Sequence, residues 1–428
     1  MLSRMEHDSI GALNVPAEAY YGVQSMRAAT NFQITHRPLH PVLIDSIVMV
    51  KKAAAITNEK SGKLDQQIVQ AIIQACDEIL DGNLRDQFIV DAIQGGAGTS
   101  ANMNANEVIA NRAIEILGGT KGDYSVVHPN DHVNMSQSTN DVIPTAGKIT
   151  VLKLLPQTIK ELEKLEKAME EKEAEFDDIL KMGRTQLQDA VPMRLGQSFG
   201  AFAHVLKRDI KRLKNVMDEM KVLNIGATAI GTAINVDPYY LANISYELSK
   251  VAGISLKQAD DLIDATQNLD GFVSVSGVLK TCAVDISKIS NDLRLMSSGP
   301  RTGLSEINLP ARQNGSSIMP GKINSVIPEV VSQVAYLIIG HDYTITMAAE
   351  AGQCEEYIEK SVGISTALCP YIGYAKSAEI AKKSLKTGIS VKELVLEEGL
   401  LKEEELKEIL KPEKMTQPMR EKVMKAVS

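Results

Sequence analysis

Four short segments rich in small polar residues interrupt long runs with helical periodicity, and residues 315–324 (GSSIMPGKIN) are the densest of them. The two glycines let successive backbone N–H groups turn toward an anion, and Lys322 adds a positive charge. Ser316 and Ser317 supply oxygens that a positive field can turn into a base or a nucleophile. The segment therefore predicts an anion-handling loop that carries a base; the alternative is a surface turn with helix-capping serines.

The other three polar segments are residues 95–104, 128–141 and 183–189. An apolar bundle does not bury clusters of Thr, Ser, Asn and Gln unless something satisfies them, and an oxygen-rich ligand would do so. Taken singly, residues 95–99 are equally a loop before a helix N-cap, and residues 138–140 are equally a helix start.

His128 and His132 are four residues apart, a spacing that can ligate a metal from one helix face. Pro129 argues against a continuous helix between them, and no acidic partner is placed as in zinc proteases. We predict a structural or anion-contacting role for both, and no metal site.

Long amphipathic helices must position these segments. Apolar residues recur at helical spacing over residues 151–180, 196–222, 277–296 and 327–351, and only 4% of the residues are aromatic. A helix over the first range would be about 45 Å long, with Pro156 either in its first turns or at a kink. Further on, Ser390 and Glu393 predict a capping box, and residues 400–410 another short helix. The pattern predicts an all-α protein built around a bundle.

Composition excludes several classes of partner. The net charge of −8 argues against nucleic acid or an anionic membrane as the main partner. The N-terminus lacks an apolar signal segment, and no stretch of about 18 apolar residues follows. The four cysteines lie far apart without metal-ligand spacing, which predicts reduced thiols in the cytoplasm.

Together the four segments resemble the aspartase/fumarase superfamily of lyases. Residues 315–324 are similar to the superfamily signature, and residues 21–25 (YGVQS) and 128–141 are similar to the branch that contains aspartases and class II fumarases. The resemblance runs from about Tyr20 to Gln353 and again from about Tyr357 to Pro418. It implies a three-domain all-α lyase with domains at 1–137, 138–356 and 357–428. It also implies a homotetramer whose active sites are shared between subunits.

Two departures from the family pattern stand out. Ser325 replaces the proline that normally follows the signature. After Gln353 the chain passes almost directly to Tyr357, so roughly forty residues are absent, enough for one bundle helix of about 45 Å and a turn. Loss of that helix would expose apolar faces, so an inactive lyase scaffold is an alternative function.

The resemblance also implies a role for each residue of the polar segments. Ser316 corresponds to the catalytic base, and Lys322 is expected to stabilise the enediolate formed when a proton leaves the carbon next to a carboxylate. The expected substrate-binding residues are Thr99, Ser138, Thr139, Asn140, Thr185, Gln186, Ser317 and Asn324. Asn140 is expected near the leaving group. The substrate would be a small dicarboxylate, with no organic cofactor and a divalent cation such as Mg²⁺ at most as an activator.

Three details favour L-aspartate over L-malate. Residues 95–100 (GGAGTS) have the aspartase form, and Thr139 stands where fumarases typically have Ser. Gln186 replaces the His of fumarases, and an amide, unlike imidazole, cannot shuttle a proton near neutral pH. The expected reaction is the reversible deamination of L-aspartate to fumarate and ammonium by anti elimination; the alternative is the hydration of fumarate to L-malate.

Overall fold

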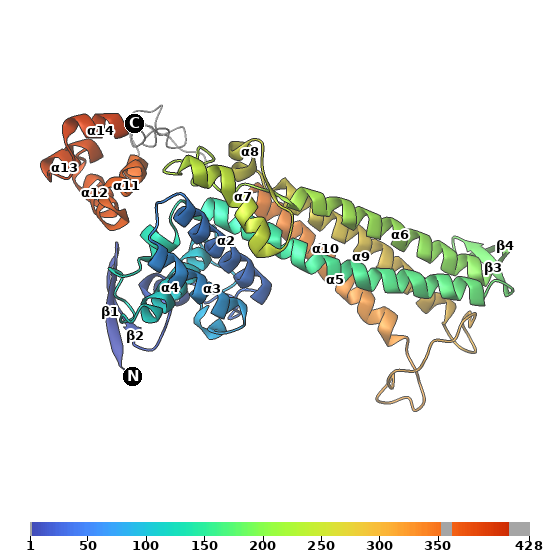
Figure 1. The fold of residues 1–428 in the computed structure, drawn as a ribbon. Helices are drawn as coiled ribbons and strands as arrows, with labels where there is room; N and C mark the ends of the chain where they lie inside the picture. Colours follow the sequence, from blue (N-terminus) through green and yellow to red (C-terminus); the bar gives the residue numbers. More distant parts are fainter. Residues whose placement is uncertain (1, 352–361, 411–428) are drawn as a thin grey trace. The chain divides into compact units, whose positions relative to one another are not determined.

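The computed structural model describes residues 2–351 and 362–410, which fall into two compact units (Figure 1). Unit 1 comprises residues 1–150, 221–268 and the described part of 352–428, and unit 2 comprises residues 151–220 and 269–351. The all-α class is confirmed, with 61% helix against 8% strand. None of the helices in these described stretches is long and apolar enough to cross a membrane.

The elements of unit 1 are β1 (Ser3–Asp8), β2 (Gly11–Pro16), α1 (Val23–Asn31), α2 (Pro41–Lys60), α3 (Gln66–Leu80), α4 (Thr99–Ile116), β5 (Val222–Leu223), α7 (Pro238–Ala252), β6 (Lys257–Gln258) and α8 (Leu262–Gln267). Its C-terminal part holds α11 (Cys369–Ile372), α12 (Tyr374–Thr387), α13 (Val391–Glu397) and α14 (Glu403–Ile409). Those of unit 2 are β3 (Leu180–Thr185), β4 (Gln188–Arg194), α6 (Leu195–Met220), α9 (Asp270–Met296) and α10 (Val326–Glu350). Helix α5 (Thr139–Glu175) begins in unit 1 and continues into unit 2.

Apolar spacing explains the packing of unit 1. In α3, Val69, Ile72, Cys76 and Ile79 recur on one face and are fully buried, and the Asp65 carboxylate caps the helix by accepting from the Gln67 N–H at 2.8 Å. Helix α3 packs against α2 and α4. Strands β1 and β2 form an antiparallel hairpin, a feature that the sequence analysis did not predict.

Helix α4 is unusual because it buries polar side chains together with apolar ones. The side chains of Asn102, Asn104, Asn106, Glu107 and Asn111 are all at most 2% exposed. Buried amides and carboxylates need hydrogen-bond partners, so this helix organises the loops around it. The Glu107 carboxylate, for example, accepts from three backbone N–H groups of residues 22–25 at 2.9–3.0 Å.

Unit 2 confirms the predicted long helices. Helices α6, α9 and α10 closely match the predicted ranges, and α9 packs against both α6 and α10. Pro156 lies well inside α5, so the prediction that it belongs to the first turns is wrong. The helix continues through Pro156 and begins twelve residues earlier than residue 151, at Thr139. The other alternative, a kink at Pro156, stays a prediction.

The C-terminal part of unit 1 has its own apolar core, formed by Leu368, Ile380, Val391, Leu394, Val395 and Leu406. The capping box at Ser390 and Glu393 is confirmed, and α14 lies within the predicted range 400–410. The three-domain division at residues 137 and 356 stays a prediction. The break after Gln353 lies outside the described residues.

Candidate active site

The first turn of α5 carries three of the expected substrate-binding residues. Ser138 precedes the helix, its hydroxyl oxygen accepts from the Asn140 N–H at 3.3 Å, and Asp141 Oδ1 accepts from the Ser138 N–H at 2.8 Å. Thr139 is the first helical residue. The sequence alternative of a helix start is thus correct, and it is compatible with binding because the start of a helix is electropositive and presents free N–H groups.

A second helix start lies against this one. Thr99 opens α4, and Gly98 before it has φ +90°. A Cβ at Gly98 would lie 2.9 Å from Ile143 Cγ1, so glycine is required for α4 to begin this close to α5. Asn102 Nδ2 donates to Thr139 Oγ1 at 3.3 Å. Two helix starts with hydroxyl side chains therefore converge in unit 1, an arrangement suited to a carboxylate.

Asp141 connects the first turn of α5 to the segment around residues 226–228. It is fully buried, and its Oδ2 accepts from the N–H groups of Gly226 and Thr228 at 3.0 and 3.1 Å. Burial raises the pKa of this carboxyl to about 7, while the N–H groups that donate to it and the Lys51 ammonium act in the opposite direction. The result is a rigid joint between α5 and residues 224–229.

The same joint orients Asn140. Asn140 Nδ2 donates to the Ala229 carbonyl at 2.7 Å, and Asn224 Nδ2 donates to the Asn140 carbonyl at 3.0 Å. Thr228, next to Ala229, holds φ at +58°, a strained value for a β-branched residue. Because a carbonyl can only accept, the Asn140 amide turns its oxygen away from Ala229 and leaves it available to a donor.

In unit 2, the loop 315–324 is closed at its base. Gly315 N donates to the Lys322 carbonyl at 2.8 Å, and Asn324 Nδ2 donates to the Gly315 carbonyl at 3.1 Å. A Cβ at Gly315 would lie 2.6 Å from Asn324 Cγ, so this crossing requires glycine. Ser317 and Lys322 are exposed.

The half-buried Ser316 hydroxyl oxygen accepts from two backbone N–H groups, those of Ile318 at 3.3 Å and Met319 at 3.0 Å. This is the capping geometry of the turn alternative. The same two donors would also stabilise a serine alkoxide, because hydrogen bonds to the charged form favour it. The geometry is therefore compatible with both readings of the loop.

Thr185 and Gln186 lie at the tip of the β3–β4 hairpin, where Gln186 and Leu187 have φ values of +52° and +62°. Arg184 ties the hairpin to the segment before the signature loop, because its Nη1 donates to Glu306 Oε1 at 2.7 Å. The side chains of Thr185 and Gln186 are both exposed.

The expected site residues thus fall into separate groups. Unit 1 brings Thr99, Ser138, Thr139 and Asn140 together, whereas unit 2 holds Ser316, Ser317, Lys322 and Asn324 in one loop and Thr185 and Gln186 at a hairpin tip. Six supporting residues were not predicted as part of the site: Lys51, Asn102, Asn134, Asp141, Asn224 and Ala229. Three of them, Asn102, Asn134 and Asp141, lie in the polar segments 95–104 and 128–141. Lys51 gave a separate signal, because it interrupts an apolar helical stripe of Ile44, Ile47, Val48, Ala54 and Ala55.

His128 and His132 serve the backbone. His128 Nδ1 accepts from the N–H groups of Asn130 and Asp131 at 3.2 and 3.1 Å, and His132 Nδ1 accepts from the His128 N–H at 2.9 Å. Burial lowers the pKa of both imidazoles. Among the described residues, no group of three or more His, Cys, Asp or Glu side chains is arranged to hold a metal ion.

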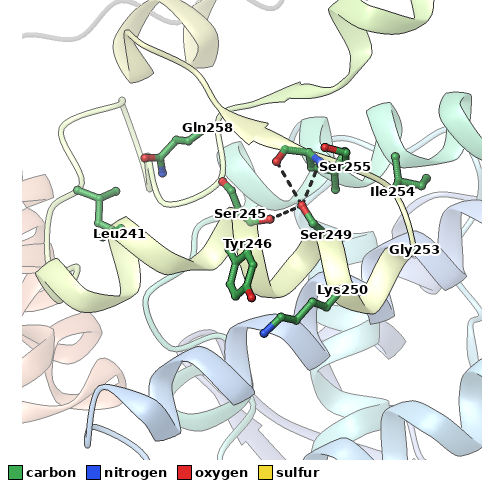
Figure 2. A pocket seen from close by; sticks show the side chains of 11 residues that line it. Leu241, Ser245, Tyr246, Ser249, Lys250, Gly253, Ile254, Ser255 and Gln258 are labelled. Carbon is green, nitrogen blue, oxygen red and sulfur yellow. Dashed lines mark hydrogen bonds between the residues drawn. The ribbon is translucent and has the colours of Figure 1, made fainter.

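A hollow of about 600 Å³ lies along α7 of unit 1 and contains none of the expected site residues (Figure 2). Its polar groups bind one another: the Ser249 hydroxyl donates to the Ser245 carbonyl at 2.7 Å, and Lys250 Nζ lies 4.0 Å from the Tyr246 ring centroid. It offers no convergent charges to a dicarboxylate.

Comparison with known proteins assigns these features to one family. A family model described as lyase matches residues 11–340, and one described as fumarase C C-terminus matches residues 364–417. Aspartate ammonia-lyase of a Bacillus species is 50% identical, over 97% of this chain and 98% of the relative. The enzyme of that name from Escherichia coli K12 is 45% identical, over 97% and 96%.

Solved structures agree. The fumarate lyase:delta crystallin from Brucella melitensis bound to cobalt is 47% identical, with a TM-score of 0.81 over 97% of this chain and 100% of that one. The class II fumarase of Schistosoma mansoni is 32% identical, with a TM-score of 0.79 over 97% of this chain and 99% of that one.

The alignment lengths bear on the expected gap. The alignment with the Bacillus relative has 457 positions, whereas 97% of 428 residues is about 415. The difference means that about forty positions of the alignment have no residue in this chain. This total agrees in size with the roughly forty residues expected to be absent.

Proposed function

The chain belongs to the aspartase/fumarase superfamily of lyases, and from that premise we propose that it is a carbon–nitrogen lyase that converts L-aspartate reversibly to fumarate and ammonium. The observation that carries this proposal is the 45–50% identity to several aspartate ammonia-lyases over 97% of the chain. Identity to the class II fumarase is lower, at 32%. The predicted preference for aspartate at Thr139 and Gln186 points the same way.

The reaction is difficult because it removes a proton from a carbon next to a carboxylate. Loss of this proton gives an enediolate, or aci-carboxylate, that carries an additional negative charge. Donors placed in advance around that charge lower the barrier, and one such donor is typically worth about 10²- to 10³-fold in rate. Breaking the bond between the neighbouring carbon and its –NH3+ group, on the opposite face, releases ammonia and completes the anti elimination. The proton that the base took from carbon accounts for the conversion of ammonia to ammonium.

We assign Ser316 as the base that takes the proton, with the Ile318 and Met319 N–H groups favouring its alkoxide. Lys322 would stabilise the enediolate. Asn140 would face the ammonium with its amide oxygen, which the Ala229 contact leaves available. The remaining carboxylate and pocket ligands in this proposal are Thr99, Ser138, Thr139, Thr185, Gln186, Ser317 and Asn324.

We further propose a homotetramer in which several copies of the chain contribute to each active site. The outer face of α10 supports association, because Ile327, Val330, Val334 and Leu337 recur at helical spacing and are 47–58% exposed. A cytoplasmic location and a reaction without an organic cofactor complete the proposal. A divalent cation such as Mg²⁺ enters it only as an activator.

The decisive experiment offers L-aspartate and L-malate separately to purified protein and follows fumarate by its ultraviolet absorbance. Turnover of aspartate alone is the expected result. Turnover of malate alone would assign the fumarase reaction instead. No turnover of either would leave the inactive-scaffold alternative.

A pair of variants tests the base. Ser316→Ala should lower kcat at least 10²-fold, since positioned proton transfer contributes about 10²- to 10⁴-fold, while fumarate binding changes little. Ser325→Ala is the matched control, because its side chain makes no capping hydrogen bond at the start of α10. Near-normal turnover of Ser316→Ala would remove Ser316 from the mechanism.

A further inference from the structure

Lys51 is a fully buried lysine on α2 whose hydrogen bonds go to amides. Its Nζ donates to Asn134 Oδ1 at 2.8 Å and to Gln137 Oε1 at 3.0 Å, and the side chain is 0% exposed. Burying a lysine is costly, so a position that keeps one has a use for its donors. The proposed reaction assigns it no role.

The ammonium determines which way its two amide partners face. An ammonium offers only N–H groups, so each amide must present its oxygen. Gln137 conforms, because its Nε2 donates to the carbonyls of Val133 and Met135 at 3.0 and 3.1 Å. Asn134 conforms as well, because its Nδ2 donates to the Gln137 carbonyl at 3.2 Å. A neutral amine would still supply the two N–H groups needed.

The orientation of the Asn134 amide determines how two side-chain amides on α4 are oriented. Its Oδ1, already facing Lys51, also accepts from Asn102 Nδ2 at 3.2 Å and from Asn106 Nδ2 at 3.1 Å. Both α4 amides must therefore turn their nitrogens toward Asn134. Their own oxygens, Asn102 Oδ1 and Asn106 Oδ1, are buried and have no hydrogen-bond partner among the described residues. The Asn102 and Asn106 amides thus keep their nitrogens toward Asn134 although their own oxygens lack a hydrogen-bond partner.

The last hydrogen bond of this series reaches Thr139 in the proposed substrate site. The same Asn102 nitrogen donates to Thr139 Oγ1 at 3.3 Å. A hydroxyl that accepts there has its single hydrogen free to donate elsewhere. Thr139 is thus set as a donor at the start of α5, which is the polarity that a carboxylate requires.

We propose that Lys51 is a positioning residue that, through Asn134 and Asn102, fixes the Thr139 hydroxyl as a donor to the substrate carboxylate. The inference rests on the proposed function, which makes Thr139 a carboxylate ligand. All four side chains belong to unit 1, and three hydrogen bonds connect Lys51 to Thr139.

Fumarate binding, measured by calorimetry on the full-length protein, tests the proposal without requiring turnover. Lys51→Met removes the donors at nearly constant side-chain length and should weaken fumarate binding about 10- to 100-fold, the usual range for losing a hydrogen bond to a charged group. Lys52→Met is the matched control on the same helix, because Lys52 pairs with Asp77 instead. It should bind fumarate like the wild type.

A double-mutant cycle separates positioning from general damage. In Thr139→Val, which lacks the hydroxyl, Lys51→Met should cost nothing further. An undiminished loss in that background, or unchanged binding in Lys51→Met alone, would overturn the proposal. If Lys51→Met does not fold, Asn102→Leu cuts the same path and must show the same dependence on Thr139.

The outcomes also separate this proposal from the assigned reaction. A wild type that binds fumarate but does not deaminate aspartate would overturn the function and leave the role of Lys51 intact. A wild type that does not bind fumarate would overturn both.

Discussion

The burial of Lys51 makes a quantitative prediction about the pH dependence of stability. Burial disfavours the charged ammonium and lowers the pKa of Lys51 from its ordinary value of 10.5 to about 7, although the Asp141 carboxylate opposes the change. In the unfolded chain the side chain is in water and recovers its ordinary pKa. Between pH 7 and 10.5 the unfolded chain therefore binds a proton that the folded chain has released.

The sign follows from proton linkage. Stability rises with pH wherever the unfolded state binds more protons, so the free energy of unfolding should increase across this window. Each pH unit contributes up to about 1.4 kcal/mol, and the full change corresponds to about 5 kcal/mol. Below pH 7 both states are protonated and the contribution is constant at its least favourable value.

The assay is denaturant unfolding of the wild type and Lys51→Met at pH 7, 8 and 9, followed by circular dichroism. Only groups that do not interact with Lys51 cancel in the difference, and Asp141 does not cancel because the Lys51 ammonium lowers its pKa. The wild type should gain about 2 kcal/mol on the variant between pH 7 and 9. Lys52→Met, which removes the neighbouring partly exposed lysine that pairs with Asp77, is the control variant. A difference for Lys51→Met that stays level within about 0.5 kcal/mol would refute the reasoning.

Three further predictions concern packing and stability. Gly22→Ala should destabilise the protein by about 2–3 kcal/mol in chemical unfolding, because its Cβ would lie 2.5–2.8 Å from three side-chain atoms; Gly62→Ala, in open space at φ +71°, should cost only about 1 kcal/mol. Asp342→Ala should cost about 1–2 kcal/mol at neutral pH, and less in acid, because the hydrogen bond from Lys280 lowers the pKa of this carboxyl and its contribution is lost as the pH falls. Glu306→Ala should raise KM for aspartate several-fold with little change in melting temperature, because Glu306 anchors the β3–β4 hairpin.

Local sequence signals were sufficient for the helices. Apolar spacing located α6, α9 and α10, and the Ser390 capping box located α13, because these signals act within one or two turns. The starts of α4 and α5 at Thr99 and Thr139 were also foreseeable from hydroxyl residues before helical runs. Pro156 was wrongly placed in the first turns because the predicted range began at residue 151, whereas α5 begins at Thr139.

Local sequence signals could not predict which polar residues form hydrogen bonds with one another. Asp141 binds N–H groups more than eighty residues along the chain, and Lys51 binds an amide 83 residues away. No periodicity or spacing rule pairs positions that far apart. The sequence showed uncharged polar residues clustered where an apolar core is expected, which indicates that they need hydrogen-bond partners. Only the fold shows that some polar residues orient others, as Asn102 orients Thr139 and Asn224 orients Asn140.

The contacts that orient Thr139 and Asn140 predict that carboxylate binding does not depend on association of the subunits. Among the described residues, every hydrogen bond that orients Thr139 and Asn140 lies within residues 2–150 and 221–268, and none involves residues 362–410, which follow the bundle helix expected to be absent after Gln353. If that gap prevents association, carboxylate binding that depends on Thr139 should persist while turnover that depends on Ser316 fails. If the chain assembles in spite of the gap, both should be present. Native mass spectrometry beside fumarate binding and aspartate turnover distinguishes these cases, and turnover by a monomer would show that one chain completes the site alone.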